Sequence, residues 1–113
     1  MTDRELLEAA ATAAGIALGE FWTPYLGIHH AQHWNPLTDD GDAFRLAVKL
    51  ELTPMHNPTL GDVHVFWEDV NGELPGESYD DHGGNRSAAT RRAIVRAAAE
   101  IGKKVDAQPG SVG

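Results

Sequence analysis

The sequence AATRRAIVRAAAEIGKKV, residues 88–105, carries the strongest helix signal in the chain. Apolar side chains recur there at intervals of three and four residues, which places them on one face of an α-helix. That face comprises Thr90, Ile94, Ala97, Ala98, Ile101 and Val105. Because most of these side chains are small, the helix can approach a sheet closely. Asn85 is a suitable N-terminal cap for it.

The stretch VHVFW, residues 63–67, predicts a β-strand because valine and tryptophan alternate with histidine and phenylalanine. Asn71-Gly72 follows and predicts a tight hairpin turn, since both residue types tolerate positive φ. We expect a short return strand around Glu73–Leu74, and Pro75 marks it as an edge strand. Residues 77–84, ESYDDHGG, are expected to form a polar, acidic loop.

A helix is predicted near the N-terminus over residues 3–14. Thr2 and Glu5 fit a capping box, in which each side chain accepts a hydrogen bond from the backbone of the other residue. Gly15 fits the left-handed position that commonly ends a helix. The apolar stripe of this helix comprises Leu6, Leu7, Ala10, Ala11 and Ala14.

Residues 40–50, DGDAFRLAVKL, predict a third helix, although 46–52 also alternates well enough to form a strand. Thr38 or Asp39 can cap the helix, and Pro54 is expected to end it. The helix would have a wide apolar face made of Ala43, Phe44, Leu46, Ala47, Val48 and Leu50.

The segment 17–36 mixes aromatic residues with glycine and proline, and short strands are plausible near 18–22 and 26–29. The order of elements predicts an α/β (α+β) fold with one domain over residues 1–106 and a flexible tail over 107–113. We expect a layered sandwich of about three helices packed on a small, mostly antiparallel sheet.

The charge of the 113-residue chain is −8, but it is unevenly distributed. Residues 1–84 contain fifteen acids and three bases, whereas residues 85–113 contain two acids and six bases. This asymmetry suits a solvated basic helix on an acidic body, and it also permits a homo-oligomer or partner docking through opposite patches. The acidic total argues against direct nucleic-acid binding.

Several classes of protein are disfavoured by composition. The chain has no cysteine, which excludes disulfides and a thiol nucleophile. No run of 18 apolar residues is present, so no membrane span is expected. The acidic start MTDRELLEAA does not fit a signal peptide, and the expected location is therefore the cytoplasm.

Three stretches resemble the small phage and prophage proteins called the phage ABA sandwich domain family. They are WNPLTDDGDAFRLAVKL (34–50), residues 88–105 and DRELLEAAATAAGI (3–16), in matching order over about half of the chain. The resemblance implies a phage origin and helices on both sides of a sheet. The family has no established catalytic residues, so the resemblance implies no chemistry. Residues 20–33 and 53–84 depart from the part of the family that is matched.

Two clusters could bind a metal. Asp39, Asp40 and Asp42 could hold Mg²⁺ through carboxylate oxygens, although helix capping explains the same residues. A zinc or nickel site could form on His29, His30 and His33, although the sequence favours a polar loop for this group. The ligand set of this metal site could be completed by His64, or by Asp80, Asp81 and His82.

Other candidate residues suit recognition. Arg86 and Arg91, at the start of the last helix, could receive the phosphate of a nucleotide. An acidic surface that includes Asp80 and Asp81 could imitate nucleic acid and occupy a basic site on another protein. Most aromatic residues should be in the core, but a surface cluster of them would make interface anchors. That cluster would be Trp22, Tyr25 and Trp34.

These observations predict a small acidic phage or prophage accessory protein that binds another macromolecule, without catalysis or a cofactor. Its partner would be a host or phage protein, as for a host-takeover or counter-defence inhibitor. One alternative is a protein that sequesters a nucleotide signal at Arg86 and Arg91. The other is a metal-dependent enzyme that uses the aspartate cluster 39–42 or the histidine cluster 29–33.

Overall fold

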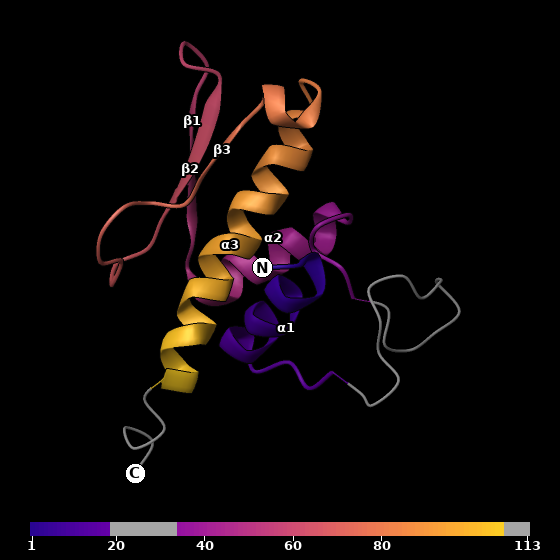
Figure 1. Cartoon of the computed structure of the whole chain (residues 1–113), viewed down its shortest axis with the longest axis vertical. Coiled ribbons are helices and arrows are strands. Elements are labelled where there is room, and N and C mark those ends of the chain that lie inside the picture. The colour runs from indigo at the N-terminus through magenta and orange to yellow at the C-terminus, as the bar shows by residue number, and fades with distance from the viewer. Residues whose placement is uncertain (19–33, 108–113) are drawn as a thin grey trace.

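Helix α3, Arg86–Ala107, runs through the middle of the structure, with the sheet on one side and α1 on the other (Figure 1). The computed structural model describes residues 1–18 and 34–107. Within them the chain forms one α+β domain of three α-helices and an antiparallel three-stranded sheet, as the sequence predicts. The other elements are α1 (Asp3–Ala14), α2 (Asp40–Leu50), β1 (Thr53–Asn57), β2 (Asp62–Phe66), β3 (Gly76–Ser78) and the 3₁₀ turn η1 (Asp80–His82).

The helix starts are formed by the capping residues that the sequence indicates. In α1 the Glu5 amide donates to Thr2 Oγ1 at 3.1 Å, and the Thr2 amide donates to Glu5 Oε1 at 3.0 Å. Asp39 caps α2 by accepting from the Asp42 amide at 2.8 Å. Asn85 accepts from the Ala88 amide at the start of α3. Each cap supplies an acceptor to a backbone donor that the first helical turn leaves unpaired.

The end of α2 differs from the expectation. Glu51 adopts a left-handed conformation with φ of 55°, and the Leu52 amide donates back to the Ala47 carbonyl at 2.8 Å. This backbone reversal ends the helix at Leu50, four residues before Pro54. Pro54 instead lies in β1, opposite Val65. A proline fits there because β1 is an edge strand.

The sheet also differs from the predicted hairpin. Its order is β1-β2-β3, and β1 was not anticipated. The tight turn joins β1 to β2, where the Gly61 amide donates to the Asn57 carbonyl at 2.8 Å. Asn71-Gly72 instead lies in the longer connection from β2 to β3. The return strand is Gly76–Ser78 rather than Glu73–Leu74, so the stretch expected to be a loop contributes a strand and η1.

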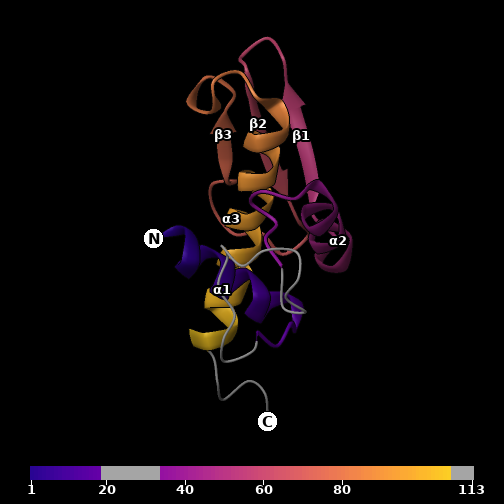
Figure 2. The same cartoon turned by 90° about the vertical axis from the view of Figure 1, so that its right-hand side faces the viewer.

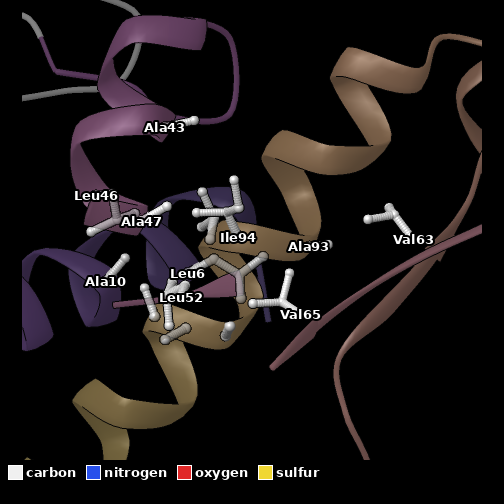
Figure 3. Packing of buried hydrophobic residues seen from close by; sticks show 14 of the residues in the cluster. Leu6, Ala10, Ala43, Leu46, Ala47, Leu52, Val63, Val65, Ala93 and Ile94 are labelled. Carbon is white, nitrogen blue, oxygen red and sulfur yellow. The ribbon is translucent and has the colours of Figure 1, made fainter. Parts of the chain in front are cut away.

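All three helices lie on one face of the sheet (Figures 1 and 2). Val63 and Val65 of β2 are fully buried toward α3, close to Ala93 (Figure 3). The opposite face of the sheet has no helix over it in the described parts of the chain. This arrangement differs from the helices on both sides that the family resemblance implies.

Helix α3 is buried on more than the predicted face because it packs between α1 and the sheet. Ile94, Ala97 and Ala98 are buried as expected. The additional buried residues of α3 are Ala89, Ala93, Val95, Ala99 and Gly102. Val105, which the periodicity placed on the apolar face, is 48% exposed because it lies near the helix end, beyond most of the packing.

Candidate binding groove

A groove of about 820 Å³ lies between α2 and the first half of α3, and β1 contributes to its wall. The end of α2 and the strand that follows it supply Leu52 and Pro54. Helix α3 supplies Thr90 and Ile94. Most of the lining is apolar, which is typical of sites that bind a ligand or a polypeptide segment.

Phe44 and Val48 form the exposed apolar wall of the groove. Their exposed fractions are 68% and 61%, although the sequence placed both on the face of α2 that should pack on the core. The packed strip is narrower and consists of Ala43, Leu46 and Ala47 (Figure 3). Small residues allow α2 to approach α3, and the larger side chains beside them are left at the rim. The apolar face predicted for α2 is therefore wider than the strip of α2 that packs on the core.

The groove has a polar end where α3 begins. His56 Nδ1 lies 2.6 Å from the hydroxyl oxygen of Tyr79, whose side chain is buried. The guanidinium carbon of Arg86 lies 5.1 Å from the centroid of the Tyr79 ring. Sequence reasoning identified Arg86 but missed His56 and Tyr79. Tyr79 could have been recognised as a buried residue because it is the one aromatic residue within the polar stretch 77–84.

Arg91 also lines the groove, but it joins α3 to α2. Its Nε donates to the Leu37 carbonyl at 2.8 Å, and its Nη1 donates to Asp40 Oδ1 at 2.6 Å. Arg86 and Arg91 therefore share a site, as the nucleotide hypothesis requires, but the second guanidinium is already engaged. Nucleotide binding stays a prediction.

The three aspartates at the start of α2 are all engaged by groups of the protein, and Arg45 lies within 3.9 Å of both Asp39 and Asp42. Asp39 caps the helix, Asp40 pairs with Arg91, and Asp42 accepts from the Asn35 amide at 3.0 Å and from Arg45 at 2.7 Å. In the described residues, no group of three or more His, Asp or Glu side chains converges as metal ligands. The histidines at positions 29, 30 and 33 lie outside the described residues, so a metal site there stays a prediction.

A second polar cluster ties β3 and η1 to α3. Glu77 is 12% exposed and accepts from Arg96 Nη1 at 2.5 Å, and its Oε1 lies 2.8 Å from His82 Nε2. Burial alone raises the pKa of the Glu77 carboxyl, whereas the hydrogen bonds with His82 and Arg96 lower it. Together with the charges of Arg96 and Arg92, they hold that pKa below its ordinary value.

The remaining predicted interaction residues are not brought into one site. Asp80 and Asp81 are exposed in η1, which is consistent with an accessible acidic surface. Trp34 is half-buried and packs against the hydrophobic core. Trp22 and Tyr25 lie outside the described residues, so the aromatic anchor cluster stays a prediction.

Comparison with known proteins finds no matching family model, no matching curated protein and no matching solved structure. Among the helices of residues 1–18 and 34–107, none combines the length and the hydropathy needed to cross a bilayer.

Proposed function

We propose that this chain is a phage or prophage accessory protein that acts in the host cytoplasm by binding another protein, without a catalytic step. The groove between α2 and α3 is its binding site. The observation that carries the proposal is the exposure of Phe44 and Val48 along the groove wall. The resemblance to small phage proteins supports the phage origin.

Phe44 and Val48 are four residues apart and therefore lie on the same side of α2. Burying apolar surface yields about 25 cal/mol per Å², so covering both side chains favours association. A helix or an extended segment of a partner can cover them by lying along the groove with its apolar side inward. The same contact would block whatever that segment otherwise binds.

The test is affinity capture from a lysate of host cells with matched baits. A Phe44→Ser/Val48→Ser variant removes the apolar wall. Leu60→Ser is the control, because Leu60 is 73% exposed but lies in the turn between β1 and β2, outside the groove. A second bait, Asp80→Lys/Asp81→Lys, examines the acidic surface.

The expected result is at least one protein that the wild type and Leu60→Ser retain and the groove variant loses. Reconstitution of that pair from purified components then shows direct binding. If wild type and groove variant capture the same proteins, the groove is not the binding site. If a captured protein is lost only with the Asp80→Lys/Asp81→Lys bait, the acidic surface is the binding site instead.

A further inference from the structure

Arg86 is positioned to recognise an anion at the polar end of the groove. Its guanidinium carbon lies over the buried Tyr79 ring, 5.1 Å from the centroid, and this cation–π contact favours holding the group at that place. A guanidinium carries five N–H donors, which point outward in the plane of the group. Among the described residues, no carboxylate or carbonyl accepts a hydrogen bond from Arg86. Its donors are therefore available to a ligand.

His56 adds a second donor at the same end. Its Nδ1 is engaged by the Tyr79 hydroxyl, which leaves Nε2 as the other ring nitrogen. When the hydroxyl donates to Nδ1, the neutral ring carries its proton on Nε2. His56 and Arg86 both line the groove, and both contact the one tyrosine. Tyr79 therefore orients both groups that can meet an anion.

The distribution of charge along the groove points to the same end. Asp40 and Arg91 line the groove but neutralise each other. Glu51 also lines the groove, but it precedes β1, whereas His56 lies near the far end of that strand. The negative charge of Glu51 is therefore at the other end of β1 from His56. Arg86 thus remains as a positive charge without an ion-pair partner in the described residues, on a chain whose total charge is −8.

We propose that the partner segment held in this groove carries an acidic side chain, which Arg86 and His56 bind while apolar side chains of the segment cover Phe44 and Val48. This inference rests on the proposed function. A polypeptide fits better than a small molecule because small ligands are usually enclosed, whereas Phe44 and Val48 stand largely exposed at the rim. A carboxylate matches the guanidinium fork with two parallel hydrogen bonds.

The experiment begins with a displayed library of random peptides, selected on the wild-type chain after depletion on the Phe44→Ser/Val48→Ser variant. The expected sequences combine apolar residues at helical or alternating spacing with an aspartate or glutamate. The most enriched peptide and its Glu→Gln or Asp→Asn analogue are then titrated against wild type, Arg86→Gln and Lys104→Gln. Lys104 is exposed on the same helix but outside the groove and serves as the control.

The acidic peptide should bind wild type and Lys104→Gln about tenfold more tightly than its amide analogue, and Arg86→Gln should remove that preference. His56→Ala should reduce the preference for the acidic peptide over its amide analogue. Enrichment of apolar peptides without acids, or with basic residues, overturns this inference and leaves the proposed function standing. Enrichment of no peptide contradicts both. A wild-type dimer that the groove variant converts to a monomer would show that a second copy fills the groove, which also overturns the inference.

Discussion

Gly102 of α3 packs directly against the backbone of Ala9 in α1, where a β-carbon at position 102 would overlap the Ala9 carbonyl oxygen. The two helices are lined by buried alanines at this crossing, including Ala10 and Ala98. The close approach is possible because no side chain separates the two backbones. The position of α1 against α3 therefore depends on residue 102 having a hydrogen atom in place of a methyl group.

Gly102→Ala is expected to destabilise the fold by about 3 kcal/mol or more, because the neighbouring atoms belong to a backbone that cannot rotate away. Helix propensity alone predicts the opposite, a gain of about 1 kcal/mol. Urea unfolding measures the difference. Gly41→Ala is the control and should cost much less, since its β-carbon would meet only side-chain atoms, those of Arg45 and of the cap Asp39, at 3.2 Å. Equal stability of wild type and Gly102→Ala would contradict the helix crossing.

Arg91→Met is expected to lower the free energy of unfolding by about 1–2 kcal/mol, because the Leu37 carbonyl loses its donor. Asp40→Asn should cost only about 0.5 kcal/mol, since the Asp40 side chain is 74% exposed and water can replace its partner. Chemical denaturation of both variants checks this asymmetry. Equal losses would show that the ion pair, rather than the bond to Leu37, joins the helices.

Asp39→Ala should destabilise the protein by about 1 kcal/mol through loss of the α2 cap, while Asp39→Asn should be nearly neutral because asparagine caps as well. Excess Mg²⁺ should leave the thermal midpoint of the wild type unchanged, because the carboxylates already accept from backbone amides and Arg45. Thermal unfolding with and without Mg²⁺ measures both effects. A midpoint raised by Mg²⁺ in wild type but not in Asp39→Asn would reveal a cation site.

Glu77 should make stability depend on pH in the acid range. A carboxyl whose folded pKa lies below its unfolded value stabilises the fold at neutral pH, and this contribution disappears as pH falls below 4.5 through the lower folded pKa. Glu77→Gln should lose about 1–3 kcal/mol of stability at neutral pH, and its stability should fall less steeply than that of the wild type as pH drops below 4.5. Urea titrations across that range test the change. The exposed Glu68→Gln is the control and should follow the wild-type profile.

The helices were the part of the fold that sequence reasoning predicted well. Their bounds depend on contacts between residues three or four apart, such as the bond from Glu5 to Thr2 or from Asp42 to Asp39. Such contacts are visible in a sequence because the partners are neighbours in it. The sheet was harder, since β1 contains Pro54 and mostly exposed residues and has no alternating apolar pattern. Hydrogen bonding to β2 holds β1 in an extended conformation, although the composition of β1 alone does not predict a strand.

The candidate site was predicted only in pieces. Arg86 and Arg91 were singled out from their place near a helix start, and both line the groove. Their different roles depend on Tyr79 and on Leu37, which are distant from one another in the sequence and meet α3 only after folding. Phe44 and Val48 were assigned to the core because periodicity reports which face of a helix is apolar, but not how much of that face a neighbouring helix covers.

The amino-acid sequence by itself determined where helices begin, which residues cap them, and that the chain is acidic with a basic last helix, because these properties arise within one or two turns of the chain. The tertiary structure decided which side of the sheet the helices occupy and which apolar side chains remain uncovered. It also brought His56, Tyr79 and Arg86 together. The reason is steric: the small side chains of Ala43 and Ala47 let α2 approach α3 beside the groove, and Gly102 lets α1 approach α3 elsewhere along that helix.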